Sequence, residues 1–132
     1  SRPFVDRLST CRLLIFDYPS TTLWEAFAAD APCLLTWNPT LFTYNDSSKP
    51  FFDALKKAGI LYDDPEEAAA QAARIYDDPR SWWDAPERKD AHRNFTKHFA
   101  RGHADWLNIW LHEIDRGLAD IPQPTVPAGA LR

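Results

Sequence analysis

Two short apolar runs on either side of a helix-length segment constrain the fold more than any other feature of the sequence. Leu13–Phe16 and Cys33–Thr36 are continuous apolar runs, the pattern of strands covered on both faces. Between them, Asp17–Ser20 predicts a loop and about Thr21–Ala29 predicts a helix. A strand, a helix and a strand within residues 13–36 predict a parallel pair joined by a right-handed crossover.

The rest of the chain continues this alternation. The further predicted elements are a short helix at Pro3–Leu8, a helix from Lys49 or Pro50 to Ala58, a strand at Ile60–Tyr62, a helix from Pro65 to Ile75 or Tyr76, a helical turn at Pro79–Trp83, and helices over about Pro86–Ala100 and Ala104–Leu118. Gly59 is placed to be a left-handed residue after a helix, and Asp63-Asp64 to cap the next one.

These elements predict the α/β class. We expect a Rossmann-like parallel sheet flanked by helices, with a helical carboxyl-terminal extension. The folded part is expected to be one domain over residues 1–121, followed by a disordered or extended proline-containing tail at 122–132. Three strands are few for such a domain, so we expect part of the fold to be absent or supplied by a partner. The missing cover over the sheet also makes self-association plausible.

Composition excludes several classes of function. The chain has 132 residues, 45% of them hydrophobic, which is enough for a real core. A net charge of −4 argues against binding nucleic acid, and no apolar run reaches the ~20 residues that span a bilayer. No basic-then-apolar leader opens the sequence, and Cys11 and Cys33 are expected to be reduced, buried thiols. We therefore expect a cytoplasmic setting, with a peripheral position at the inner membrane as an extension of it.

The residues after the first apolar run carry the groups best suited to binding a ligand. In parallel α/β sheets, ligands bind at the carboxyl ends of the strands. The hydroxyls of Ser20, Thr21 and Thr22, with the free amides of a first helical turn, would form an anion site. Asp17 precedes them, and Glu25 lies one turn further on, where a carboxylate can accept the hydroxyls of a ribose.

Structural roles for the same residues remain open. Thr22 and Glu25 also have the spacing of a capping box, and Asp17 can accept hydrogen bonds within its turn. The loop that begins with Trp37 and Asn38 can cover a base or sugar by stacking, or simply pack. We expect the four histidines and the paired tryptophans to pack between helices or lie at the surface. The sequence indicates no metal site and no cofactor.

The run from Leu13 to Leu35 resembles the carboxyl-domain signature of GT-B glycosyltransferases. In that signature a strand leads to a Gly/Ser/Thr turn, a helix with an early Glu, a Pro and another strand. The continuation is similar to the sugar transferases of bacterial surface carbohydrate biosynthesis at Trp37-Asn38-Pro39, Lys49-Pro50-Phe51-Phe52, Ala58-Gly59-Ile60-Leu61 and Asp78-Pro79-Arg80-Ser81-Trp82-Trp83. The likeness covers roughly residues 3–112.

This resemblance implies a nucleotide-diphosphate sugar as the donor, with its diphosphate over the hydroxyl-bearing turn and its ribose on Glu25. The residues expected to bind it are Asp17, Ser20, Thr21, Thr22, Glu25, Trp37 and Asn38. It also implies an amino-terminal acceptor domain that is missing here, so the chain is expected to be inactive alone, and no catalytic residue is assigned. Pro19-Ser20 stands where many such enzymes have a glycine pair.

Two other classes of function compete with this interpretation. An apolar strand that ends in Asp17 has the outline of a haloacid-dehalogenase phosphatase, although Pro19 occupies the place of that family's second acid. A non-catalytic module that binds a protein through exposed aromatic residues is the other alternative.

Overall fold

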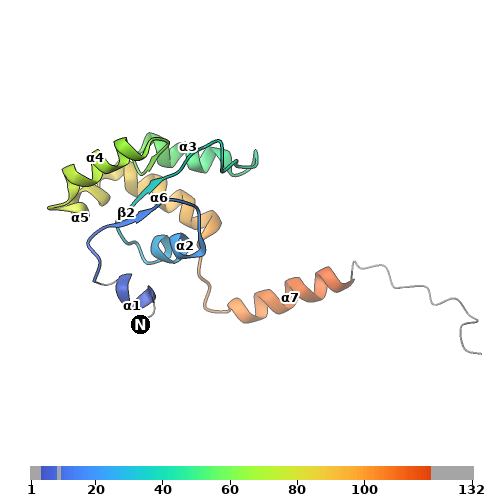
Figure 1. Ribbon diagram of the computed structural model, residues 1–132. Helices are drawn as coiled ribbons and strands as arrows, with labels where there is room; N and C mark the ends of the chain where they lie inside the picture. The colour runs from blue at the N-terminus through green and yellow to red at the C-terminus, as the bar shows by residue number, and fades with distance from the viewer. Residues whose placement is uncertain (1–3, 9, 120–132) are drawn as a thin grey trace, which may run out of the picture. The chain divides into compact units, whose positions relative to one another are not determined.

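The computed structural model describes residues 4–8 and 10–119, which fall into two units, within Ser1–Arg101 and Gly102–Arg132. The elements of the larger unit are α1 (Phe4–Leu8), β1 (Leu14–Phe16), α2 (Thr21–Ala28), β2 (Cys33–Thr36), α3 (Lys49–Lys57), β3 (Leu61–Tyr62), α4 (Pro65–Ile75), α5 (Pro79–Trp83) and α6 (Pro86–Phe99) (Figure 1). The smaller unit contains α7 (Trp106–Ala119). The predicted tail at 122–132 lies outside the described residues.

The three strands form one parallel sheet in the order β1-β2-β3. Leu14 is in register with Cys33, and Leu35 with Leu61. This confirms the predicted strand–helix–strand unit and the mixed α/β class. In the described part of the chain, no helix has the length and hydropathy needed to cross a membrane.

The central strand β2 is covered on both faces, as its apolar run predicts. Cys33 and Leu35 join the core cluster that includes Phe27 of α2 and Phe95 of α6. Leu34 packs in a second cluster with two residues of α4, Ala68 and Ile75. Successive side chains of a strand point to opposite faces, so α2 and α6 cover one face of β2 and α4 covers the other.

The helix ends follow the local sequence. Gly59 follows α3 with a φ of 70°, the left-handed conformation expected of it. Asp64 caps α4 by accepting a hydrogen bond from the backbone N–H of Glu66 at 2.8 Å. Asp78 caps α5 in the same way through the N–H of Ser81 at 3.1 Å.

The cysteines and tryptophans divide between core and surface. Both thiols are free, but only Cys33 is buried, so the expectation that Cys11 is buried is wrong. Trp83 is fully buried, whereas Trp106 and Trp110 on α7 are 59% and 63% exposed.

We predict that Gly59→Ala lowers the free energy of unfolding by about 1 kcal/mol or more, because alanine is strained at positive φ. A Cβ at this position would also lie 3.3 Å from the Tyr62 hydroxyl. Chemical denaturation checks the prediction. Gly102→Ala is the control, since nothing lies within 4 Å of a Cβ there, and an equal effect of both substitutions would contradict the argument.

Candidate functional site

The carboxyl ends of the strands meet at one edge of the sheet because the strands are parallel. Phe16 is in register with Leu35, so the turn after β1 and the loop after β2 leave the sheet side by side. Asp17 begins the first of these segments, and Trp37 and Asn38 begin the second. The topology therefore brings the two predicted groups of site residues to the same edge.

The turn after β1 leads directly into α2. Ser20 is its N-cap residue, in extended backbone geometry with φ −127° and ψ 166°, and its side chain caps no backbone amide. Instead, the Ser20 and Thr22 hydroxyls are hydrogen-bonded to each other at 2.7 Å. The Leu23 N–H donates to the Ser20 carbonyl oxygen at 3.0 Å, but the N–H groups of Thr21 and Thr22 belong to the first turn, whose amides have no partner four residues back within the helix. The turn therefore brings these two N–H groups together with the hydroxyls.

The predicted alternative for this turn, a capping box between Thr22 and Glu25, is wrong. Thr22 is the second residue of α2 rather than its N-cap, and its hydroxyl bonds with Ser20. The sequence pattern was misleading because a serine and two threonines stand in a row, and the helix begins two residues earlier than a capping box of Thr22 and Glu25 requires.

Glu25 lies on the same side of α2 as Thr21, since the two residues are four apart. Both side chains are exposed. Among the described residues no hydrogen bond or ion pair of the Glu25 carboxylate is found, so it is free to accept hydrogen bonds from a ligand. Asp17 and Tyr18 are also exposed, so the turn is open to solvent and is not sealed under neighbouring side chains.

The loop after β2 is fixed by its aromatic residues. Trp37 is only 3% exposed, and its indole N–H donates a hydrogen bond to the Tyr44 hydroxyl. Tyr44 in turn stacks on Phe52 of α3 with ring centroids 3.9 Å apart. Trp37 therefore anchors the loop, while the neighbouring Asn38 is exposed and its side-chain oxygen accepts a hydrogen bond from the Thr40 N–H at 2.9 Å.

Comparison with protein families identifies the chain. A family model described as "LIC12162 family transferase" matches residues 1–114. The chain belongs to the LIC12162 family of transferases. No curated protein and no solved structure matches it significantly.

Family membership places a group-transfer function on this fold and leaves the transferred group open. Within the described residues, no three His, Cys, Asp or Glu side chains are grouped so as to hold a metal ion. The polar groups of the open edge are the hydroxyls of Ser20, Thr21 and Thr22, the carboxylates of Asp17 and Glu25, and the amides of the first turn of α2. This set suits an anionic ligand that also carries hydroxyl groups.

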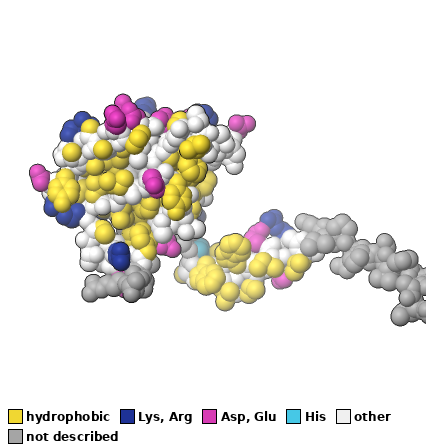
Figure 2. All heavy atoms as spheres, in the orientation of Figure 1, with side chains coloured by type: hydrophobic (Ala, Val, Ile, Leu, Met, Phe, Trp, Pro, Cys, Tyr) yellow, Lys and Arg dark blue, Asp and Glu magenta, His cyan; other side chains and the backbone are white. Residues whose placement is uncertain are grey.

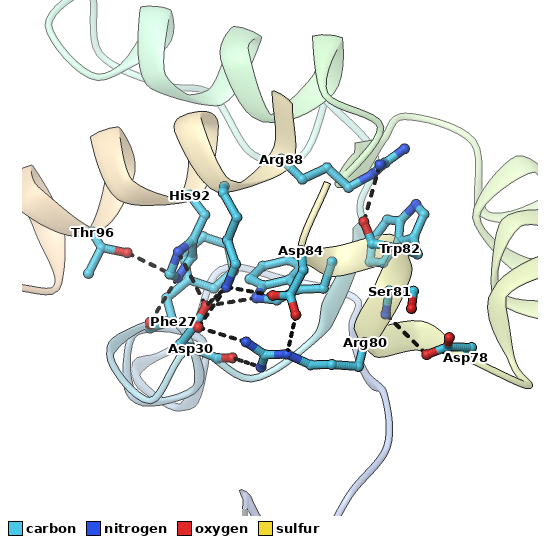
Figure 3. Close-up of polar contacts among 12 residues, drawn as sticks. Phe27, Asp30, Asp78, Arg80, Ser81, Trp82, Asp84, Arg88, His92 and Thr96 are labelled. Atoms are coloured by element: carbon cyan, nitrogen blue, oxygen red, sulfur yellow. Dashed lines mark hydrogen bonds and ion pairs between the residues drawn. The ribbon is translucent and has the colours of Figure 1, made fainter. Parts of the chain in front are cut away.

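A polar network of this transferase lies at the other end of α2, around Asp30 (Figure 3). Trp83 Nε1 donates a hydrogen bond to one Asp30 carboxylate oxygen at 2.8 Å. Lys89 Nζ lies 2.6 Å and Arg80 Nη2 3.0 Å from the other oxygen. Asp84 completes the network, with one oxygen 2.9 Å from Arg80 and the other 3.0 Å from Lys89.

No local sequence pattern around Asp30 predicts this network. The φ of Asp30 is 53°, the left-handed region that Asp tolerates better than most residues. In the sequence, Asp30-Ala31-Pro32 appears only as a helix end before a strand. The partners lie 50 to 59 positions further along the chain, so only the tertiary fold reveals them.

His92 has contacts that resemble those of a catalytic base, but its geometry gives it a structural role. It is 5% exposed, and its Nε2 lies 2.9 Å from the Phe27 carbonyl oxygen and 3.2 Å from the Thr96 hydroxyl. A carbonyl only accepts hydrogen bonds, so Nε2 carries the hydrogen and cannot take a proton from Thr96. Burial lowers the pKa of His92 and favours its neutral form.

We predict that Asp30→Asn lowers stability at neutral pH and flattens the acid limb of the stability profile. Partial burial raises the pKa of Asp30, but hydrogen bonds from Lys89, Trp83 and Arg80 outweigh it and lower the pKa to about 2. The unfolded value is about 3.9, so this stabilisation is complete above pH ~4 and is lost as pH falls towards 2.

Denaturant unfolding between pH 2 and 7 measures this effect. Asn also tolerates positive φ, so the substitution removes the charge without straining the backbone. Asp90→Asn is the control, because Asp90 is 71% exposed and pairs with Arg93 three residues further along the same helix. If both variants kept the wild-type acid limb, Asp30 would not be the group responsible for it.

Proposed function

We propose that this transferase domain binds the donor of a sugar-transfer reaction, and that the donor is a nucleotide-diphosphate sugar. The observation that carries the proposal is the turn between β1 and α2, where the partly buried Ser20 and Thr22 hydroxyls and the exposed Thr21 lie at a helix N-terminus that no side chain caps. N–H groups at a helix N-terminus favour phosphate oxygens. A diphosphate is therefore the ligand fragment best matched to Ser20, Thr21 and Thr22.

Glu25 and the loop after β2 complete the proposed site. One turn beyond the phosphates, the exposed Glu25 carboxylate accepts hydrogen bonds from the ribose hydroxyls. Asp17 and Asn38 border the same edge of the sheet. The Trp37 ring is buried and is not free to stack on a base. Its contribution is to hold the loop after β2 in place.

The chemical contribution of this domain is electrostatic. As the sugar leaves, negative charge builds up on the nucleotide diphosphate, and preorganised N–H and O–H donors stabilise that charge without reorganising. In this proposal the domain is the carboxyl half of a GT-B enzyme of surface carbohydrate synthesis at the cytoplasmic side of the inner membrane. The site that binds the acceptor, and the base that activates the acceptor, belong to an amino-terminal domain.

We predict that nucleoside diphosphates raise the melting temperature of the chain, because a ligand that binds only the folded state stabilises it by mass action. A panel of diphosphates, monophosphates and nucleosides with different bases identifies the preferred ligand by thermal shift. Magnesium-dependent release of phosphate that Asp17→Asn abolishes would instead indicate a phosphatase. The absence of any nucleotide effect would contradict the donor site.

We predict that Glu25→Ala weakens binding of the preferred diphosphate at least about tenfold, the cost of losing one or two hydrogen bonds to a charged group. The variant should also lose the distinction between that diphosphate and its 2′,3′-dideoxy analogue. The melting temperature without ligand should not change, since the Glu25 side chain is exposed.

Calorimetric titration measures both effects. Glu67→Ala is the matched control, because Glu67 lies in the first turn of another helix, α4, and is also exposed. If Glu25→Ala bound both ligands as the wild type does, Glu25 would not contact the ribose.

We predict that Thr22→Val weakens binding of the diphosphate but leaves binding of the nucleoside unchanged. Valine has a similar shape but lacks the hydroxyl that bonds with Ser20. The ratio of the two dissociation constants is the measurement, and an equal loss for both ligands would show that Thr22 acts through the fold rather than on the phosphates.

A further inference from the structure

The hydroxyl oxygen of Thr36 is buried and has no hydrogen-bond partner among the described residues. Thr36 is the last residue of β2, the central strand of the sheet. Its register partner on β3 is Tyr62, and the preceding residue, Leu35, pairs with Phe16 of β1. The hydroxyl therefore lies in the middle of the sheet edge at which the donor site is proposed.

The Thr36 side chain points to the side of the sheet that α4 covers. Cys33 and Leu35 pack in the cluster on the α2 side, whereas Leu34 packs against α4. Side chains alternate along a strand, so Thr36 points the same way as Leu34. The larger unit is rich in apolar side chains, which Figure 2 shows gathered on its visible face. A buried hydroxyl on this side of the sheet is therefore an exception that needs an explanation.

Packing alone does not explain a threonine at this position. Valine has nearly the same shape, is equally suited to a strand, and has no oxygen that can be left unpaired. A buried hydroxyl without a partner gives up its hydrogen bonds with water and gains none in return, which destabilises the fold. Such groups are few in native proteins. Because this one lies where parallel sheets bind their ligands, a ligand that supplies the partner explains it best.

A simple side-chain rotation brings the Thr36 hydroxyl out of its buried position. The residue as a whole is partly exposed, although its hydroxyl oxygen is not. The hydroxyl and the methyl group are both attached to Cβ, so a rotation of ~120° about the Cα–Cβ bond moves the oxygen to another staggered position. The backbone does not move in this rotation, and the strand keeps its register.

The connectivity of a nucleotide-diphosphate sugar indicates which of its groups lies near Thr36. The diphosphate joins the ribose at one end to the sugar at the other. A crossover helix runs antiparallel to the strands that it connects, so Glu25 lies back along α2 from the turn. A ribose bound there directs the sugar the other way, across the carboxyl ends of the strands. Neighbouring strands are about 5 Å apart, so the end of β2 is within the reach of a sugar ring at the end of β1.

We propose that the Thr36 hydroxyl binds a hydroxyl group of the donor sugar and so contributes to the choice of sugar. This inference rests on the proposed donor site, from which it takes the position of the diphosphate. The hydrogen bond forms only in the complex, because the oxygen has no partner among the described residues of the free chain. Thr36 thus contacts the sugar, whereas the residues between positions 17 and 25 hold the nucleotide.

Calorimetric titration with two kinds of probe tests this proposal: the diphosphates UDP, GDP, ADP and dTDP, and their conjugates with glucose, galactose or mannose. We expect Thr36→Val to bind the preferred diphosphate as the wild type does, but its preferred sugar conjugate about five- to tenfold more weakly, the cost of one hydrogen bond. Thr36→Ser keeps the hydroxyl and should bind both ligands like the wild type. Thr43→Val is the control, since Thr43 is exposed in the loop after β2.

Thermal unfolding without ligand separates this role from a structural one. Removal of a buried hydroxyl that has no partner leaves the melting temperature of Thr36→Val unchanged or raises it, whereas loss of a structural hydrogen bond lowers it. A lower melting temperature, or the same affinity of Thr36→Val and the wild type for every conjugate, would overturn the proposal and leave the donor site intact. If the wild-type chain bound no diphosphate, the donor site would fail, and this inference with it.

Discussion

The Asp30 carboxylate is the interaction on which the rest of this fold depends. It lies just after α2 and just before β2, and it binds Arg80 and Trp83 of α5 and Lys89 of α6. This contact fixes the end of α2 against α5 and α6, where the Phe27 ring meets those of Trp83 and Phe95. A helix of eight residues is too short to hold itself together. Its orientation, and with it the direction of its free N-terminus, is set by packing at its far end.

The two ends of α2 thus have different properties. At the carboxyl end, every strong donor around Asp30 is used, and cations and carboxylates neutralise one another. At the amino end, about 12 Å away by helix rise, hydroxyls and amides have few partners within the protein, and Glu25 has no partner among the described residues. A ligand site needs unsatisfied groups on a rigid support. In this transferase the stability of one end supplies the rigidity that the other end requires.

Local signals in the sequence were enough to predict the parallel sheet, but not the network that supports it. The apolar runs at Leu13–Phe16 and Cys33–Thr36 and the glycine at position 59 each act through neighbouring residues, and the structure confirms them. The Asp30 network joins residues 50 or more positions apart, which no local pattern encodes. The capping box failed for a related reason: three hydroxyl residues in a row leave the start of a helix undecided, and the tertiary fold selects Ser20.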